Sequence, residues 1–347
     1  MMAMVSKEFR QMRRDRRTLA MMILMPVVLL LVFGYAASFD VTTITTATLG
    51  PGAEQAAGLL PAPFEVDVTD TAGDRESAQA LLRDGEVDVA IVTGAQTTAL
   101  IDGSELFTAR AAHQALTAAA SQVPGGVSVE VLFNPELDTS AVLVPGLAGL
   151  ILIFVGTLLT SLGVVRERQA GTLEQLAVMP FRARDVVIGK IAPYFMVAAV
   201  DLVVVLFVGT LVFDVPFNGS LLTLALGAVL FLLVTLGVGV LISTVSENQG
   251  QAIQLALMSL LPQVLLSGII FPLESMAAGV RWIGYLLPLT YFNQIAKGVM
   301  VRGAPIGSLT QPMLLLALLG MIVFGLAILR FSRDLAPAHT DPVEVGA

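Results

Sequence analysis

Residues 147–180 read LAGLILIFVGTLLTSLGVVRERQAGTLEQLAVMP, and this stretch decides the kind of fold that the chain can adopt. Its first part, 147–165, is an apolar run without a charged side chain, and the run ends abruptly in Arg166-Glu167-Arg168. A helix needs roughly 20 such residues to cross the hydrocarbon core of a bilayer. The stretch therefore predicts a membrane-spanning helix that emerges into water at residue 166.

The rest of the chain repeats this pattern. Of its 347 residues, 56% are hydrophobic and 13% are charged, and the mean hydropathy is +0.84. Ordinary soluble domains carry about twice that share of charged residues. Comparable apolar runs lie at 19–37, 186–213, 221–245, 253–271 and 313–329. The sequence thus excludes a soluble globular protein and predicts an α-helical integral membrane protein with six transmembrane helices.

The charges are segregated along the chain. Residues 1–17 carry six basic and two acidic side chains, a net charge of +4, directly before the first apolar run. Residues 40–141 carry fifteen acidic side chains against three arginines, a net charge of −12. Because basic residues concentrate on the cytoplasmic side of membrane proteins, residues 1–17 are predicted to be cytoplasmic and residues 40–141 extracytoplasmic.

Residues 1–17 also place Val5, Phe9 and Met12 on one helical face, which predicts a cytoplasmic amphipathic helix at the membrane interface. This helix leads into a first transmembrane helix at 18–39. A cleaved signal peptide is the alternative, since a basic start followed by an apolar run is typical of one. Against that alternative, the run is long and Ser38-Phe39-Asp40 makes a poor cleavage site.

Residues 40–141 have the alternating character of a small α/β domain inserted between the first two spans. Segments rich in Val, Ile and Thr predict strands at 43–49, 64–68, 87–92, 98–101 and 127–133. Helices are predicted at 77–83 and 105–121, each preceded by turn-forming residues. About 100 residues suffice for one domain of this kind.

Threading six spans from a cytoplasmic N-terminus assigns a side to every other segment. Residues 142–331 become a five-helix transmembrane region, with segment 166–185 and the tail 332–347 in the cytoplasm. Most basic side chains beyond residue 141 then lie on the cytoplasmic side. A seventh span at 282–300 is the alternative, but it would place Arg330 and Arg333 outside.

The fifth apolar run is interrupted. It contains Pro262, Ser267 and Gly268, and it ends in Phe271-Pro272. Backbone groups freed at membrane depth must find partners inside protein or in a wet cavity. The pattern predicts a half-helix or an outer re-entrant region over 262–300, and a simple proline kink is the alternative.

Segment 166–185 joins two spans in the cytoplasm. Thr172 can cap a short helix whose apolar face comprises Leu173, Leu176 and Ala177, and Pro180 would end that helix. The segment follows the pattern R-E-x-x-x-G-T-x-E-x-L-x-x-x-P. A short amphipathic helix between two spans is suited to lie on the membrane or to bind another protein.

This pattern resembles that of permease subunits of ABC transporters, in the type-2 membrane-domain class associated with export. Residues 133–146, 266–276 and 287–292 resemble further segments of the same family, in the same order. Ala277-Ala278 depart from it, since the family often has a proline there. The resemblance implies that the cytoplasmic segment couples to an ATPase through Arg166, Glu167, Gly171, Thr172, Glu174, Leu176 and Pro180.

The resemblance also implies partners. Two ABC ATPase subunits would bind ATP and Mg, and a second permease chain, identical or different, would complete a dimer in the lipid bilayer. The chain itself lacks a G-x-x-x-x-G-K-[ST] phosphate loop, so we expect no ATP hydrolysis, no cofactor and no catalytic site in it. It has no cysteine, only His113 and His339, and no basic patch that would indicate nucleic acid.

Asp201 is the one acidic residue well inside a predicted span, where a charge costs at least about 2.5 kcal/mol. It is predicted either to hydrogen-bond a neighbouring helix or the second permease, or to line the transport path. The same two roles, transport path or helix packing, apply to Pro262, Ser267, Gly268, Phe271 and Pro272.

Three functions are compatible with these features. The first is the permease of an exporter in the cell membrane that moves a hydrophobic or amphiphilic substrate, such as a drug, an antibiotic or a lipid. The second is a membrane-anchored sensor that binds a ligand through its outer domain, although its cytoplasmic tail is short. The third is a four-span, mechanotransmission-type ABC membrane protein.

Overall fold

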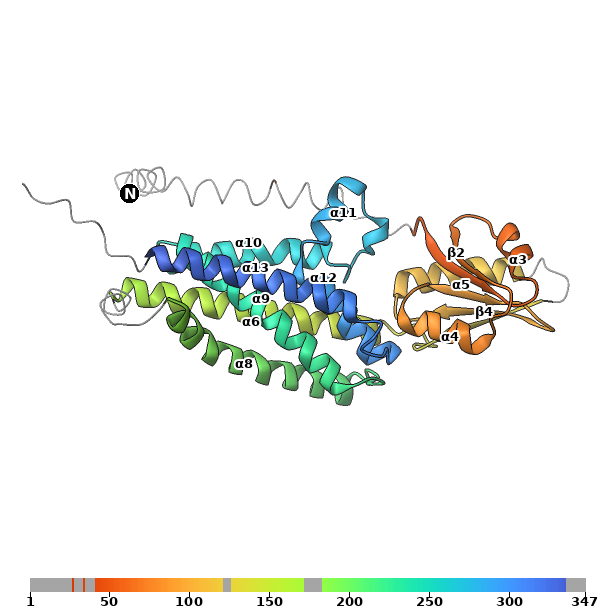
Figure 1. Ribbon diagram of the computed structural model, residues 1–347, viewed down its shortest axis with the longest axis horizontal. Coiled ribbons are helices and arrows are strands. Elements are labelled where there is room, and N and C mark those ends of the chain that lie inside the picture. The colour runs from red at the N-terminus through yellow and green to blue at the C-terminus, as the bar shows by residue number, and fades with distance from the viewer. Residues whose placement is uncertain (1–26, 28–33, 35–40, 121–125, 172–182, 335–347) are drawn as a thin grey trace, which may run out of the picture.

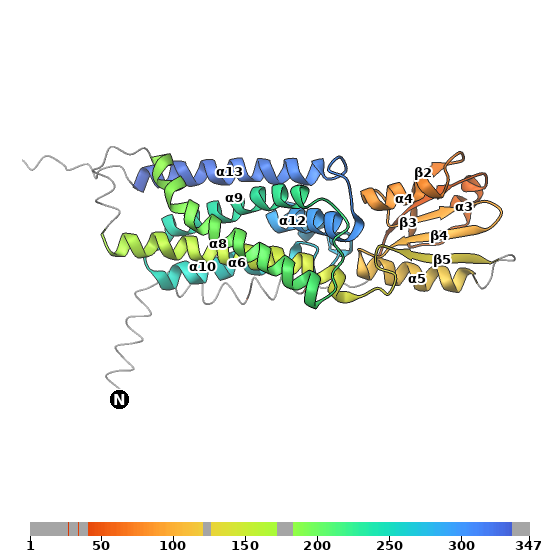
Figure 2. The ribbon, with the colours of Figure 1, turned by 90° about the horizontal axis from the view of Figure 1, so that it is seen from below.

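The computed structural model describes residues 27, 34, 41–120, 126–171 and 183–334. Figures 1 and 2 show a long bundle of helices with a separate α/β domain at one end. The predicted interfacial helix 1–17, nearly all of the first span 18–39, and most of the tail 332–347 lie outside the described residues.

The α/β domain is a five-stranded sheet in the order β2-β1-β3-β4-β5. Strand β4 runs antiparallel to β3, and the other neighbouring pairs are parallel. The strands are β1 (Ile44–Leu49), β2 (Phe64–Asp70), β3 (Val89–Val92), β4 (Thr97–Asp102) and β5 (Val127–Leu132). All five predicted strands are therefore confirmed, with ends that shift by one or two residues.

Helices cover both faces of this sheet. Helix α4 (Arg75–Asp84) packs its Ala78 and Leu82 against one face, and α5 (Leu106–Ala120) packs Ala112 and Leu116 against the other. Both helices were predicted from the sequence. A third helix, α3 (Ala53–Leu59), was not predicted, because its short sequence AEQAAGL offers no apolar periodicity and no side-chain cap.

The bundle contains the helices α6 (Thr139–Gln169), α8 (Ala183–Val212), α9 (Leu221–Val245), α10 (Gln249–Leu266) and α13 (Thr310–Asp334). In the described part of the chain, four segments are long and apolar enough to span a membrane: Thr139–Gln169, Ile188–Val212, Leu221–Val245 and Thr310–Arg330. The structure therefore establishes a helical membrane protein with four candidate spans. The prediction of six spans goes beyond it.

Helix α10 occupies the predicted fifth span but begins with three polar residues, Gln249, Gln251 and Gln254, among its first six. Pro262 lies inside this helix and does not end it. The helix ends instead at Leu266, and Gly268 follows with φ +83°, a conformation that a glycine adopts without steric cost.

Residues 267–309 fold into short elements at the end of the bundle nearest the α/β domain (Figure 2). These are a 3₁₀ turn η1 (Leu273–Ser275), the helices α11 (Ala278–Gly284) and α12 (Pro288–Lys297), and a π-helix η2 (Gly298–Arg302). No continuous helix forms over 282–300, so the alternative of a seventh span there was wrong. Helix α12 is almost entirely buried, and its Phe292 stacks on Phe231 of α9.

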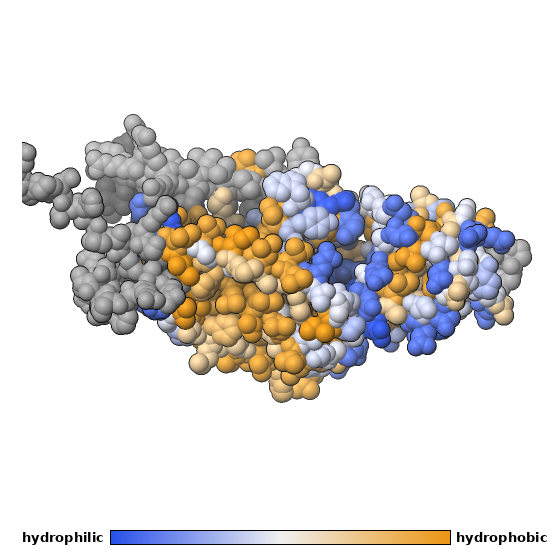
Figure 3. Space-filling view, viewed as in Figure 1, coloured by the Kyte–Doolittle hydropathy of each residue, from blue (hydrophilic) through white to orange (hydrophobic). Residues whose placement is uncertain are grey.

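On the face shown in Figure 3, the bundle is apolar over a broad band, whereas the α/β domain carries many polar residues among fewer apolar ones. On α8 the exposed side chains include Met196, Val200, Val203, Phe207 and Leu211. Large exposed apolar surfaces are unfavourable in water. The band is therefore the surface that lipid covers.

Helices α6 and α9 pack closely because small residues face each other. A Cβ atom added at Gly239 of α9 would lie 2.8 Å from the carbonyl oxygen of Thr157 and 2.8 Å from the Cβ of Thr160, both on α6. Small residues of this kind allow membrane helices to approach closely. The backbone oxygen cannot move aside without disturbing α6 itself.

Gly239→Leu is expected to disrupt the bundle by forcing α6 and α9 apart, at a cost of roughly 3 kcal/mol or more. Gly325→Leu on α13 is the matched control, because a Cβ atom there meets nothing within 4 Å. The yield of monodisperse protein after detergent extraction and its thermal unfolding measure the difference. Equal behaviour of the two variants would show that this contact does not limit stability.

Candidate functional site

The connection between the α/β domain and the bundle is built around Asn134. Its side-chain Nδ2 donates to the carbonyl oxygens of Gly103 at 3.3 Å and Asp138 at 3.0 Å, and its Oδ1 accepts from the backbone N–H of Asp138 at 2.9 Å. Asp138 in turn caps α6 by accepting from Ser140. One buried side chain thus ties the end of β4 to the start of the long helix α6.

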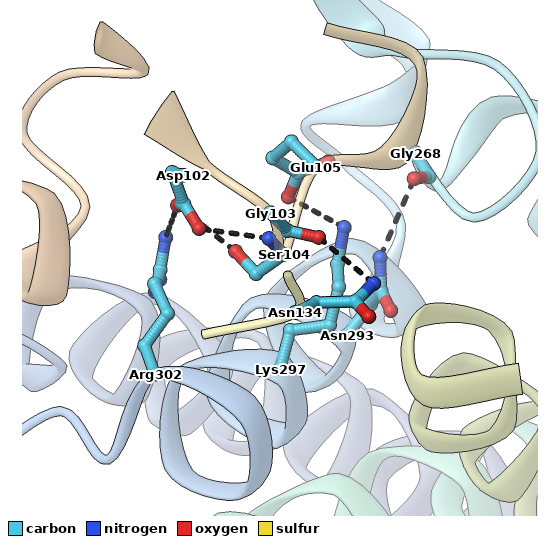
Figure 4. Close-up of polar contacts among 9 residues, drawn as sticks. All are labelled: Asp102, Gly103, Ser104, Glu105, Asn134, Gly268, Asn293, Lys297 and Arg302. Carbon is cyan, nitrogen blue, oxygen red and sulfur yellow. Dashed lines mark hydrogen bonds and ion pairs between the residues drawn. The ribbon is translucent and has the colours of Figure 1, made fainter. Parts of the chain in front are cut away.

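Two ion pairs join the α/β domain to the short elements of the bundle (Figure 4). Lys297 of α12 donates to Glu105 at 2.5 Å, and its side chain is only 5% exposed. Arg302 at the end of η2 lies 3.4 Å from Asp102, which is 2% exposed and also accepts from Ser104. Asp102 is the last residue of β4, and Glu105 lies in the turn between β4 and α5.

A cavity of about 420 Å³ lies between the two parts of the molecule. The wall from the α/β domain includes Asp84, Glu86, Asp88 and Glu105. The wall from the bundle includes Ser267, Glu274, Tyr285, Tyr291, Asn293, Lys297 and Arg302. The structure thus forms a polar, mainly acidic chamber at one end of the bundle.

Burial raises the pKa of two carboxyl groups at this junction. The pKa of Asp88 rises from 3.8 to about 6, because desolvation outweighs the hydrogen bonds from the side chain and backbone of Thr45, and Glu105 and Asp102 add repulsion. Burial also raises the pKa of Asp102, although the Arg302 guanidinium opposes this shift. Ionised Asp88 therefore destabilises the folded chain near neutral pH.

Asp88→Asn is expected to stabilise the chain at pH 7.5 but not at pH 5. Because the folded pKa lies above the unfolded one, the stabilising contribution of the protonated Asp88 is complete below pH 4. It is lost as the pH rises through about 6, at a cost on the order of 2–3 kcal/mol. Thermal unfolding of the full chain at both pH values measures this.

Asp74→Asn is the control with the opposite sign. Hydrogen bonds from Ser77 lower the pKa of Asp74, so its stabilising contribution is present near neutral pH and is lost as the pH falls. This variant should therefore be less stable than the wild type at pH 7.5 and at pH 5 alike, because both pH values lie above the ordinary Asp pKa of 3.8. An Asp88→Asn effect that does not change with pH would contradict the assignment.

The opposite end of the bundle carries the described part of the predicted coupling segment. Glu167 forms an ion pair with Lys190 near the start of α8. Arg168 donates to the carbonyl oxygens of Ser243 at 2.9 Å and Ser246 at 3.1 Å, and thereby holds the end of α6 on the end of α9. Arg166 is exposed, and Gly171 has φ +73°. Thr172, Glu174, Leu176 and Pro180 lie outside the described residues.

Asp201 lies midway along α8 and is partly exposed. Within the described residues, its carboxylate forms no hydrogen bond and no ion pair. A contact to a neighbouring helix of the same chain, one of its predicted roles, is therefore absent from this part of the structure. A contact with a second permease and a position on the transport path remain predictions.

The remaining predicted site residues divide between two places. Ser267, Gly268 and Pro272 line the cavity at the α/β domain, and Phe271 is buried beside them in a small apolar cluster. Pro262 lies one helical turn earlier, inside α10. Asp201 and segment 166–185 are elsewhere, so the structure brings together only part of the predicted set.

Sequence reasoning missed the residues that hold the α/β domain on the bundle: Asp102, Glu105, Asn134, Lys297 and Arg302. Asn134 lies in segment 133–146, which carries part of the family resemblance, but that resemblance gave it no role in the connection. A lysine in an otherwise apolar outer segment was the one available signal for Lys297. Its partner is 192 residues away in the chain, which no local pattern can reveal.

The fold and these sites together define the class: a multi-pass helical membrane protein with an α/β domain before its first long helix. Comparison with known proteins then specifies it. Residues 16–329 match the family described as "ABC-2 family transporter protein", and the chain belongs to this family.

Individual relatives support this membership. The chain is 30% identical over 368 residues to "Probable multidrug ABC transporter permease YbhS" of Escherichia coli (strain K12), covering 96% of this chain and 97% of that protein. It is 28% identical to "Probable multidrug ABC transporter permease YbhR" of the same organism, covering 87% and 89%. It is 33% identical over 207 residues to "Inner membrane transport permease YhhJ", covering 58% and 54%.

The predicted resemblance to ABC permeases is thereby confirmed. Members of this family are transport permeases, not catalytic subunits, and in ABC transporters generally the ATP is bound by a partner ATPase. A partnering ATPase follows for this chain too.

Proposed function

We propose that this chain is the permease subunit of an ATP-driven exporter that moves hydrophobic or amphiphilic compounds, such as drugs, antibiotics or lipids, out of the cell. The main support for this proposal is the similarity, over nearly the full length of both chains, to a protein described as a probable multidrug permease. The apolar composition of the bundle supports the same substrate class. Asp201 is the one acidic residue well within its long helices.

The proposed topology has six spans in the inner or plasma membrane, with both termini cytoplasmic and residues 40–141 outside. Five long helices after the α/β domain support it, with the apolar run 19–37 as the sixth. The proposed domain boundaries are the ones predicted from the sequence: 1–17, 18–39, 40–141, 142–331 and 332–347. Residues 262–300 form the outer re-entrant part, because α12 is buried among the outer ends of the long helices.

ATP-driven motion would enter through segment 166–185. Arg168 clamps the end of α6 onto α9, and the pair of Glu167 with Lys190 joins the same end of α6 to α8. A force applied to this segment by a partner would therefore act on three helices at once. The complete complex would contain two permease chains and two ATPase subunits.

The two other functions are less well supported. The sensor is disfavoured because the match to the ABC-2 transporter family covers residues 16–329, the α/β domain and the bundle together. A four-span mechanotransmission protein would have three spans after its outer domain, whereas five long helices follow it here. Both alternatives also predict that vesicles containing this chain and an ATPase transport no substrate.

Reconstitution of the chain with its ATPase in lipid vesicles tests the proposal. ATP-dependent movement of hydrophobic cations, neutral antibiotics or labelled lipids is expected, and the mass of the detergent-solubilised complex should correspond to two permeases and two ATPases. Full ATP-driven transport by a particle with one permease would contradict the dimer. Absence of transport for all three compound classes would contradict the export function.

Asp201→Asn is expected to preserve transport of every substrate within about twofold, because we propose that Asp201 hydrogen-bonds the second permease and an amide retains that capacity. Asp201→Leu should instead weaken the dimer, which the mass of the complex in detergent measures. A selective loss of cationic substrates in Asp201→Asn would place the carboxylate on the transport path.

A further inference from the structure

The cavity between the α/β domain and the bundle contains more negative charge than its neighbours neutralise. Lys297 and Arg302 are already paired with Glu105 and Asp102. Within the described residues, the carboxyl groups of Glu86, Asp88 and Glu274 form no ion pair, and all three residues line the cavity. The Arg281 guanidinium donates to the backbone carbonyl oxygen of Glu274 and not to its carboxylate. A chamber with three uncompensated carboxyl groups attracts cations and repels anions.

Polar atoms without a partner are also concentrated here. Six buried side-chain polar atoms of the described residues form no hydrogen bond, and four of them belong to residues that line this cavity: Asp84, Ser267, Asn293 and Arg302. Ser267 is only 1% exposed and Asn293 only 3%. Buried polar atoms normally find partners, so the hydroxyl of Ser267 and the amide oxygen of Asn293 are available to a ligand.

The composition and size of the cavity restrict what this ligand can be. Its volume of about 420 Å³ falls within the range of roughly 300–1,000 Å³ that small organic ligands occupy. In the described part of the chain, no group of three or more metal-ligating side chains is placed to hold a metal ion. Tyr285 and Tyr291 supply aromatic faces that attract organic cations.

We propose that this cavity is a binding site for amphiphilic organic cations, with the carboxyl groups of Glu86, Asp88 and Glu274 attracting the charge and Ser267 and Asn293 hydrogen-bonding the ligand. The proposal rests on the export function and narrows its substrate class. Because the cavity lies at the end of the bundle that we place outside, it would hold a substrate at the exit of the transport path.

Equilibrium binding of ethidium, a planar organic cation, to the full chain in phosphatidylcholine nanodiscs tests the proposal. Saturable binding above that of empty nanodiscs is expected. The double variant Glu86→Gln/Glu274→Gln should bind ethidium about fivefold more weakly or worse, since each lost charge pair near the surface contributes up to about 1 kcal/mol. Both side chains are exposed, so the fold should tolerate the change.

The matched control is Glu65→Gln/Glu76→Gln, which removes the same charge from exposed positions of the α/β domain outside the cavity. This control should bind ethidium like the wild type. Ser267→Ala removes a hydroxyl that forms no hydrogen bond in the fold, so it should weaken binding severalfold without destabilising the chain. Binding of the neutral dye N-phenylnaphthylamine should be insensitive to both carboxyl double variants.

Several results would overturn the proposal: no saturable binding by the wild type, ethidium binding that Glu86→Gln/Glu274→Gln leaves within twofold, an equal loss in the control, or unchanged affinity in Ser267→Ala. The export function is tested separately by ATP-dependent transport. Transport of neutral compounds without ethidium binding would disprove the cation site alone. Ethidium binding at the cavity without ATP-dependent transport would disprove the export function alone.

Discussion

Glu105→Gln is expected to destabilise the folded chain by about 3 kcal/mol, because it leaves the ammonium group of Lys297 buried without its partner. The side chain of Lys297 is 5% exposed, whereas that of Glu105 is 37% exposed. The cost of breaking this pair therefore depends on which partner is removed. Thermal unfolding of the purified full chain measures it.

Lys297→Met is the informative comparison. It replaces the buried cation with an apolar side chain of similar length, and the Glu105 carboxylate that remains can be hydrated. Lys297→Met should be clearly less destabilised than Glu105→Gln. The double variant Glu105→Gln/Lys297→Met should have a stability close to that of Lys297→Met. If Lys297→Met proves as harmful as Glu105→Gln, the buried ammonium group is not the source of the penalty.

Glu167→Lys is expected to reduce ATP-coupled transport about tenfold or more while the chain still inserts into the membrane. Reversing a charge at a contact with a partner typically costs several kcal/mol. The Glu167 side chain is 41% exposed in the permease, so it has surface left for an ATPase to contact. Transport and substrate-stimulated ATP hydrolysis in vesicles are the measurements. The sequence pattern predicts the same result for Glu174→Lys.

The ion pair with Lys190 requires a separating experiment, because Glu167→Lys also places two cations side by side. The swap Glu167→Lys/Lys190→Glu restores the internal pair but not a contact with the ATPase. We expect the swap to remain uncoupled, and full recovery would show that Glu167 acts only inside the permease. Glu136→Lys, the same reversal at an exposed position three residues before the opposite end of α6, should transport normally.

Most of the architecture could be predicted because its signals are local. The strands of the α/β domain coincide with segments rich in Val, Ile and Thr, and the long helices of the bundle coincide with the apolar runs. The exact end of the fifth apolar run depends on packing as well as on local signals. Pro262 does not end α10, since a helix packed on its neighbours continues through a proline, and Gly268 ends it instead.

The sequence by itself determined that this is a helical membrane protein with an acidic α/β domain and a motif that resembles those of ABC permeases, because hydropathy, net charge and short motifs are properties of contiguous residues. Only the tertiary structure decided how the α/β domain sits on the bundle. Its two ion pairs join residues 192 and 200 positions apart. It also decided that Glu86 and Glu274, remote in sequence, line one cavity with Ser267 and Asn293. Contacts between residues so far apart in the chain result from the packing of whole helices and strands, so no local sequence pattern can predict them.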